Sequence, residues 1–469
     1  MKHMEPRFIE KLEINCVSHP DTVALIQAGT GKSMTYAEMW EYSGRVYRFL
    51  KQEGIGKENV VMIALPRGID PVVALIGIWR AGAAAVMLEA DYEPERMDYI
   101  RRDAGCVLKI GESLFSAMMA GASLKGYEET SLHDLAYLIY TSGTTGTPKG
   151  VMQEYGTLEM CIRCHFCGER PVIDGRFALI SPLYFVVSML VIPPLLDNVQ
   201  TLAVIPTDIV RDPDRLPDCI EALQITNMFI VPSMLKHLKR IPDSLTRIVA
   251  GGEPVKGIFS SRVQIFCGYG QSESGFNIST FLIDREYDVT PVGIIGEQKA
   301  EIRILDDDGN ELPAGEAGNL CYKAPYFRGY LSLPGLTEQV RLNGMIRSGD
   351  YGMICRDGKI VITGRADEMI KIRGNRIEPA EIESVLREIL QVEWVGVRGI
   401  FDQGHPYLCA YYTGEPEISV EEAQRLAARR LPPYMVPSCF MKVDRIPRNA
   451  NGKIAKGKLP APDRGGGKR

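Results

Sequence analysis

The sequence lacks several features that would assign a class of protein at once. Basic residues are not in excess, because 54 Lys and Arg face 59 Asp and Glu among 469 residues. That balance gives no sign of nucleic-acid binding or of attraction to a membrane surface. The start of the chain, MKHMEPRFIEKLE, has no apolar core of a secretory signal, and no internal repeat is visible. We therefore expect a cytoplasmic protein without a nucleic-acid partner.

Disulfides and membrane spans are not indicated either. The eleven cysteines are an odd number scattered over the chain, which favours reduced thiols over a disulfide framework. Residues 177–196 contain no charge. However, Pro182, Pro193 and Pro194 leave only about ten residues between them for a helix, too few to span a bilayer. We expect a strand followed by a buried helix, and no membrane insertion.

The chain does have the pattern of a layered α/β protein. It is 45% hydrophobic and 24% charged, so it can bury large cores, and its length suits two to four domains at about 150 residues each. Over the first 300 residues or so, apolar strand-like runs such as 60–65 and 83–88 alternate with helical patterns such as 70–80. This alternation predicts mostly parallel sheets with helices between the strands.

The pattern changes twice towards the end of the chain. Between residues 300 and 364, turn signals such as DDDGN and RDGK separate short alternating strands, which predicts a small β-rich subdomain. A helix should begin near Pro379 and another should cover 420–430, with strands at 393–397 and 408–412 between them. We predict an N-terminal domain over 1–365, with its β-rich part at about 300–365. A small α+β C-terminal domain over 366–459 and a flexible tail over 460–469 should follow.

The most informative segment is YTSGTTGTPKG at residues 140–150. It lies between two apolar runs, so a strand should lead into it and another should lead out. Three glycines free the backbone to expose its N–H groups, the hydroxyls add donors, and Lys149 supplies a positive charge. These are the groups that hold a polyphosphate. A bland Gly/Ser/Thr loop is the competing interpretation.

Further segments supply the other groups that a nucleotide needs. In GYGQSESG, Tyr269 stands between two glycines and can lie against a planar ligand, while Glu273 is a hard oxygen ligand for Mg²⁺. Asp350, in a tight turn, can accept both hydroxyls of a ribose, and Arg365 can add a guanidinium. Lys453 follows an Asn-Gly turn. Each signal is weak alone, since solvated turns and surface lysines are common.

Together these segments resemble the AMP-forming acyl-adenylating superfamily, which includes acyl-CoA ligases, aryl-acid ligases and adenylation domains of nonribosomal peptide synthetases. The resemblance runs from about Thr35 to Leu459. YTSGTTGTPKG resembles the family's phosphate loop, and GYGQSE its Tyr-Gly-x-Thr-Glu motif, with Ser272 in place of the usual Thr. GRADEMIKIRGNRIEPAEIE resembles the hinge segment. LPPYMVP and NGKIAK have the form typical of peptide-synthetase adenylation domains.

The resemblance implies a role for each matching residue. The ATP- and AMP-binding residues would be Thr141, Ser142, Gly143, Thr144, Thr145, Lys149, Gly252, Glu253, Pro254, Tyr269, Gly270, Asp350 and Arg365. Ser272 would bind the α-phosphate and Glu273 would hold Mg²⁺. Lys453 would bridge the substrate carboxylate and the α-phosphate, and Asp367 would be the hinge about which the small domain rotates. ATP and Mg²⁺ are thus the implied cofactors, and the implied acceptor is a phosphopantetheine thiol.

The acyl pocket differs from that of amino-acid-activating relatives, in which Phe-Asp begins the pocket helix and the Asp binds the substrate ammonium. The matching pair here is Phe185-Val186, and no carboxylate is among the aligned positions. Those positions are Phe185, Val186, Val187, Leu190, Phe229, Val249, Gly251, Gly268, Phe276 and Asn277. A buried ammonium without a partner costs several kcal/mol. We therefore predict an aryl, aliphatic or keto acid as substrate, with Asn277 binding its hydroxyl or carbonyl.

The predicted function is ATP-dependent formation of an acyl-adenylate, followed by acyl transfer to a thiol. No carrier domain follows Lys458, so we expect a separate carrier protein as acceptor. An acyl-CoA ligase that uses free CoA is the first alternative. An amino-acid-activating enzyme with an atypical pocket is the second, and a non-catalytic nucleotide-binding module is the third.

Two other patterns point elsewhere. Gly29-Thr30-Gly31-Lys32-Ser33 ends like a Walker loop, but Ile26 stands where that motif needs glycine, so we expect a hairpin turn. Cys161, Cys164 and Cys167 suggest a haem, zinc or iron–sulfur site. Their spacing of three also puts the thiols near one helical face, where cysteine serves as a small hydrophobe, and we favour that interpretation.

Overall fold

The structure is a computed structural model that describes residues 7–141, 148–163, 175–297, 300–365, 369–372, 374–402, 405–445, 447 and 456–462. The chain divides into two compact units. Unit 1 comprises Met1–Asp91, Arg101–Ile139 and Gly150–Ala366, and unit 2 comprises Tyr92–Ile100, Tyr140–Lys149 and Asp367–Arg469. The predicted α/β class is confirmed, whereas the predicted domain limits stay predictions.

The largest sheet of unit 1 contains eight of the described strands, in the order β13-β12-β11-β10-β8-β9-β1-β2. From β12 to β1 each strand runs parallel to its neighbours, and β13 and β2 add antiparallel edges. The strands are β1 (Val23–Gln27), β2 (Lys32–Thr35), β8 (Arg176–Leu179), β9 (Thr201–Val204), β10 (Asn227–Ile230), β11 (Arg247–Gly251), β12 (Gln264–Gly270) and β13 (Asn277–Leu282). The predicted hairpin turn is confirmed between β1 and β2.

A second sheet of unit 1 has the order β17-β7-β6-β4-β3-β5 over the described strands. Its members are β3 (Val60–Leu65), β4 (Ala84–Glu89), β5 (Leu108–Ile110), β6 (Leu135–Thr141), β7 (Lys149–Glu154) and β17 (Phe327–Tyr330). All residues of β3 and β4 are buried, because helices cover parallel strands and leave no polar face. The predicted strands before and after the phosphate loop are thus confirmed as β6 and β7.

The third sheet of unit 1 is antiparallel. It comprises β14 (Gly293–Ile294), β15 (Ile302–Leu305), β16 (Ala317–Tyr322), β18 (Arg341–Leu342), β19 (Met345–Ile354) and β20 (Lys359–Arg365). Its short strands alternate with the turns that the sequence indicates at DDDGN and RDGK. These strands carry the Asp350 and Arg365 segments.

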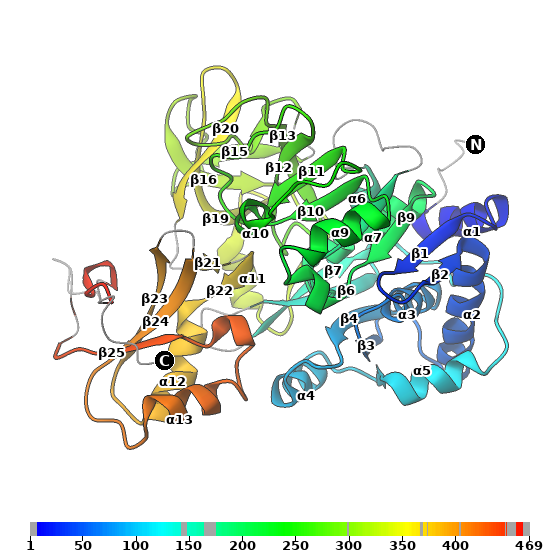
Figure 1. The fold of residues 1–469 in the computed structure, drawn as a ribbon, viewed down its shortest axis with the longest axis horizontal. Helices are drawn as coiled ribbons and strands as arrows, with labels where there is room; N and C mark the ends of the chain where they lie inside the picture. The colour runs from blue at the N-terminus through cyan, green and yellow to red at the C-terminus, as the bar shows by residue number, and fades with distance from the viewer. Residues whose placement is uncertain are drawn as a thin grey trace. The chain divides into compact units, whose positions relative to one another are not determined.

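Helices of unit 1 lie against the parallel sheets. Figure 1 shows α3 next to β3 and β4, with α2 beside α3. Thr35 begins α2 as a capping residue, since its hydroxyl accepts the N–H of Glu38 at 3.2 Å. The helices are α1 (Phe8–Ser18), α2 (Tyr36–Gln52), α3 (Asp70–Arg80), α5 (Glu112–Met119), α6 (Tyr155–Arg163), α7 (Val186–Asp197), α8 (Thr207–Val210), α9 (Arg215–Ala222), α10 (Pro232–His237) and α11 (Pro334–Val340).

Helix α7 corrects one expectation. The sequence predicts a helix that stops before Pro193 and Pro194, but α7 continues through both prolines to Asp197. All residues from Ser188 to Asp197 are buried. Burial of this apolar surface outweighs the cost of an internal proline, which is about 3 kcal/mol. No described helix of the chain is both long and apolar enough to cross a membrane.

Unit 2 is built around a three-stranded sheet in the order β23-β24-β25. Its described elements are β21 (Ile370–Ile372), β22 (Asn375–Ile377), α12 (Pro379–Leu390), β23 (Val395–Asp402), β24 (His405–Tyr412), α13 (Val420–Ala427), β25 (Cys439–Lys442) and the 3-10 turns η1 (Pro433–Met435) and η2 (Lys456–Lys458). Most of α4 (Pro94–Asp103) also belongs to it. In Figure 1, α12 packs beside β23. The predicted helix starts at Pro379 and Val420 are confirmed.

Candidate active site

The carboxyl ends of three parallel strands lie side by side in the eight-stranded sheet. Phe229 of β10 is in register with Val249 of β11, and Gly251 of β11 with Gly268 of β12. A Cβ at Gly251 would lie 2.6 Å from the Gly268 carbonyl oxygen and 3.0 Å from the Phe229 ring, so only glycine fits there. Open α/β sheets bind ligands outside this end of their strands.

A buried polar network joins β12 to the antiparallel sheet. The Tyr269 hydroxyl donates to Asp350 Oδ2 at 2.7 Å, and Arg365 Nη1 lies 2.5 Å from Asp350 Oδ1. The predicted tight turn at Asp350 is wrong, because this residue lies within β19 and is a direct partner of Arg365 in the β19–β20 ladder. Gln271 Nε2 donates to the Ser348 carbonyl oxygen at 2.7 Å. Burial raises the pKa of Tyr269 well above its usual range, and the Asp350 carboxylate raises it further, so the hydroxyl stays a donor.

The Glu273 turn follows β12 and is fixed from two sides. Gln153 Nε2 donates to the carbonyl oxygens of Ser272 at 2.8 Å and Glu273 at 3.1 Å. The Tyr330 hydroxyl donates to Glu273 Oε1 at 2.7 Å. Glu273 is a buried carboxylate with a defined orientation. Such a hard oxygen donor fits Mg²⁺, which binds through one or two carboxylates and phosphate oxygens.

The segment after β11 also has defined geometry. Gly252 has φ +81°, a conformation that favours glycine. Glu253 Oε2 accepts the backbone N–H of Ser233 at 2.9 Å, which anchors the segment to the start of α10. Pro254 is exposed. Gly270 ends β12, so these residues lie near the same strand ends as Gly251.

The described part of the phosphate loop fits a bound phosphate. Thr141, at the end of β6, has a buried hydroxyl that lacks a hydrogen-bond partner within the described residues. Buried hydroxyls normally have a partner, and a phosphate oxygen would supply one. Lys149, at the start of β7, is buried as well. Ser142, Gly143, Thr144 and Thr145 lie outside the described residues.

The predicted acyl-pocket residues come from five elements of unit 1 and the residues beside them. Phe185 is the N-cap of α7, and Val186, Val187 and Leu190 lie in its first turns. Phe229, Val249, Gly251 and Gly268 belong to the adjacent strands β10, β11 and β12. Phe276 and Asn277 lie at the start of β13, where Asn277 is in register with Gly270.

The Asn277 side chain is held by backbone. With its amide oriented to satisfy its neighbours, Nδ2 donates to the carbonyl oxygens of Tyr269 at 3.0 Å and Ser279 at 3.3 Å. Both amide hydrogens are used in these two bonds. The side chain can therefore still accept a hydrogen bond at Oδ1, but it has no hydrogen left to donate.

Several predicted residues lie outside the described part of the chain. They are Lys453, Asp367, Cys164 and Cys167. Cys161 is described, and its buried thiol donates to the Gly275 carbonyl oxygen at 3.1 Å. Within the described residues, no group of three or more His, Cys, Asp or Glu is placed to hold a metal ion.

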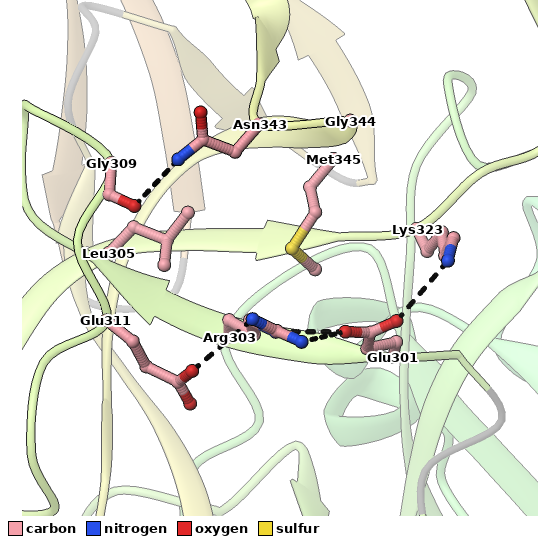
Figure 2. A pocket seen from close by; sticks show the side chains of 9 residues that line it. All are labelled: Glu301, Arg303, Leu305, Gly309, Glu311, Lys323, Asn343, Gly344 and Met345. Atoms are coloured by element: carbon pink, nitrogen blue, oxygen red, sulfur yellow. Dashed lines mark hydrogen bonds and ion pairs between the residues drawn. The ribbon is translucent and has the colours of Figure 1, made fainter.

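The structure also contains a surface cavity of about 290 Å³ in the antiparallel sheet. Figure 2 shows its lining residues, which are Glu301, Arg303, Leu305, Gly309, Glu311, Lys323, Asn343, Gly344 and Met345. Arg303 pairs with Glu301 at 2.6 Å and with Glu311 at 3.5 Å, and Lys323 pairs with Glu301 at 3.6 Å. The charged residues that line the cavity thus pair with one another, and none of the lining residues belongs to the predicted site.

Three residues that contact the Tyr269–Asp350 network or the Glu273 turn were not predicted as site residues. Gln153 and Tyr322 belong to no segment that stood out in the sequence, although the Tyr322 hydroxyl donates to Gln271 Oε1 at 3.2 Å. Gln271 lies within GYGQSESG and could have been named, because it stands between Tyr269 and Glu273.

Comparison with solved structures finds the same fold in other proteins. An o-succinylbenzoate CoA synthetase from Bacillus subtilis superposes with a TM-score of 0.84, at 24% identity over 96% of this chain and 97% of that chain. An artificially fused adenylation–PCP di-domain from Klebsiella oxytoca superposes with a TM-score of 0.82, at 22% identity over 94% of both chains. Both likenesses show the fold alone.

Sequence comparison gives the family. The AMP-binding enzyme model matches residues 12–331, and the model of the AMP-binding enzyme C-terminal domain matches residues 381–453. Gramicidin S synthase 2 from Brevibacillus brevis is 30% identical over 99% of this chain, which covers 11% of that protein. Gramicidin S synthase 1 from the same species is 30% identical over 95% of the chain, which covers 43% of it. The chain belongs to the AMP-binding enzyme family, whose members are AMP-forming ligases that make acyl-adenylates.

Proposed function

We propose that this chain joins a carboxylic acid to ATP, releases pyrophosphate and holds the acyl-adenylate for transfer to a thiol. The observation that carries the proposal is the buried network of Tyr269, Asp350 and Arg365 beside the Glu273 turn. In the family, residues at these positions bind adenine, ribose and metal. Here the same side chains converge within one unit, which supports the same use.

The predicted roles of the remaining residues follow from charge. A carboxylate that attacks ATP brings two anions together, and negative charge grows on the α-phosphate. Mg²⁺ on Glu273 would neutralise part of that charge. Lys149 and the Thr141 hydroxyl would bind phosphate oxygens, Ser272 would bind the α-phosphate, and Lys453 would approach the reacting carboxylate.

The substrate proposed is an uncharged acyl group: an aryl, aliphatic or keto acid. The support is the absence of a carboxylate among the ten pocket positions, with Val186 where amino-acid-activating relatives have Asp. The amide of Asn277 adds one refinement, because both its hydrogens are bound to backbone. Its remaining acceptor favours a substrate hydroxyl over a substrate carbonyl.

The proposed acceptor is the phosphopantetheine thiol of a separate carrier protein, with free CoA as the alternative. The peptide-synthetase form of LPPYMVP and NGKIAK supports the carrier protein. The curated relatives also support it, since they are peptide synthetases of which this chain covers only a part. Asp367 would be the hinge at which the small domain turns between the two half-reactions.

Pyrophosphate exchange against a broad panel of carboxylic acids tests the proposal. We expect exchange with one class of plain acid, and weak or no exchange with α-amino acids. If α-amino acids far outperformed plain acids, the substrate class would be wrong. Tight ATP binding without exchange with any acid would instead support a non-catalytic nucleotide-binding module. The enzyme that holds the acyl-adenylate would then be incubated with CoA and, separately, with holo-carrier proteins. The thiol that takes up the acyl group is the acceptor.

A further inference from the structure

A buried ion pair joins the two parallel sheets of unit 1. Arg67 follows β3 and Glu89 is the last residue of β4. Their side chains are 7% and 11% exposed, and Arg67 Nη1 lies 3.1 Å from Glu89 Oε1. A buried charge pair is weak evidence for stability, because desolvation cancels much of the attraction. Its other hydrogen bonds therefore indicate what it does.

Within the described residues, every other side-chain hydrogen bond of this pair goes to backbone at or just after the ends of β8 and β9. Arg67 donates to the carbonyl oxygens at the ends of β8 and β9, namely Leu179 O at 2.8 Å, Ser181 O at 2.8 Å and Ile205 O at 2.7 Å. Glu89 Oε1 accepts the N–H of Leu183 at 3.1 Å. The planar guanidinium suits this use, because its five donors point in fixed directions.

The backbone that the pair binds leads directly into α7. Residues 180–185 connect β8 to that helix. The hydroxyl oxygen of Ser188, in the first turn, lies 2.8 Å from the carbonyl oxygens of both Leu183 and Phe185, so its one hydrogen is shared between these acceptors. Leu183 is thus held by Glu89 on one side and by Ser188 on the other. The position of Val186 follows from these contacts, because it lies between the two anchored points.

We propose that Arg67 and Glu89 are positioning residues that set the start of α7 and thereby the fit of the acyl group. The inference rests on the proposed function, which places Phe185 and Val186 in the acyl pocket. The pair touches neither the nucleotide network nor the Glu273 turn in the described structure. Loss of the pair should therefore raise the KM for the acid and leave the KM for ATP unchanged.

The test compares two buried arginines with the same kind of contact. Arg80 is fully buried and also donates to backbone carbonyls, at Gly126 and Leu124, but not to the segment before α7. Lysine keeps the charge and loses the fork at either site. Arg67→Lys should raise the KM for the acid at least about tenfold, as expected when hydrogen bonds to a charged group are lost. Its KM for ATP should stay within about twofold.

Arg80→Lys is the matched control. It should lower the melting temperature by a similar amount and leave the KM for the acid unchanged. Glu89→Gln is the second variant: it keeps an acceptor for Leu183 and removes the charge that balances the buried Arg67, so it should also raise the KM for the acid and leave the KM for ATP within about twofold. Equal effects of Arg67→Lys and Arg80→Lys on that KM, or equal rises in the KM for acid and ATP, would overturn the proposal.

A second readout is independent of activity. Backbone hydrogen exchange over residues 180–190 should accelerate in Arg67→Lys and stay unchanged in Arg80→Lys. Unchanged exchange in Arg67→Lys would refute the positioning role even if the protein were inactive. A wild-type protein without pyrophosphate exchange would remove the proposed function, while faster hydrogen exchange in Arg67→Lys would still establish that the pair holds the start of α7.

Discussion

Replacing Gly275 by alanine tests whether the Glu273 turn depends on its close packing against β6, β7 and α6. Gly275 has φ +69°. A Cβ there would lie 2.5 Å from Thr157 Cγ2, 2.8 Å from Gln153 Cδ and 2.8 Å from the Tyr137 hydroxyl oxygen. These distances are all too short for a carbon atom, so the turn or its neighbours must move. Gln153 is the residue that holds the Ser272 and Glu273 carbonyls.

Two costs contribute to the expected effect. A left-handed conformation costs an alanine about 1–2 kcal/mol, and an added methyl in a well-packed site costs about 1–3 kcal/mol. We expect Gly275→Ala to destabilise unit 1 by about 2–5 kcal/mol, a fall of several degrees in melting temperature. Because the strain falls on the turn that carries Glu273, pyrophosphate exchange should fall further than the loss of folded protein explains.

Gly257→Ala is the control for the backbone cost. Gly257 has φ +60°, and no atom of the described residues lies within 4 Å of its ideal Cβ. Differential scanning fluorimetry should therefore show a loss of about 1–2 kcal/mol there, with exchange unchanged. Equal falls in melting temperature for the two variants would refute the packing argument. Normal exchange in Gly275→Ala would refute the link between this packing and the catalytic turn.

Three further predictions concern other parts of the chain. Lys453→Ala should slow acyl-AMP formation at least about a hundredfold and preserve ATP binding; an unchanged rate would remove the assigned role. Burial raises the pKa of Glu159, whose carboxylate accepts the Phe8 N–H at 2.8 Å. Stability is then lost as pH rises from the ordinary value of 4.5 through the raised folded pKa, so the melting temperature of Glu159→Gln relative to the wild type should rise over that interval and then stay level; a relative fall would contradict this sign. Burial raises the pKa of the Cys409 thiol, which is fully buried, whereas Cys439 is partly exposed, and the thiolate is the form that reacts. Iodoacetamide mapping of the folded protein should therefore find Cys439, its partner at 3.0 Å, alkylated first; equal rates would contradict it.

The predicted site residues that the structure brings together are those whose signal is local in the sequence. Tyr269 and Glu273 occur in one short segment, and turn chemistry fixes their relation within a few residues. Asp350 and Arg365 lie on adjacent strands joined by a short turn, which brings them close together, and a one-residue bulge between Tyr351 and Gly352 makes them direct partners. In each case a few neighbouring residues determine the geometry, and a single sequence contains them.

The residues that were missed act over long distances along the chain. Gln153 reaches Glu273 across 120 positions, and Arg67 reaches Leu179 across 112. Glutamine and arginine at such positions look like ordinary surface residues, because their contacts depend on how two sheets pack. The predicted end of α7 was wrong for a related reason. Local propensity predicts that the helix ends at its prolines, but burial of the whole segment keeps it helical to Asp197.

The difference between local and long-range signals matters for the acyl pocket. Which side chains line the pocket can be predicted from the sequence, but where they lie depends on contacts with distant residues. The sequence can show that Val186 brings no carboxylate. It cannot show where Val186 lies, because in our proposal that position depends on the Arg67–Glu89 pair. The pair binds the backbone at Ser181 and Leu183, and Glu89 is more than ninety residues from Leu183 in the sequence. A substitution at the pair could therefore change the acid preferred without altering any pocket residue. Substrate predictions from pocket residues alone should be least reliable in relatives that lack this pair.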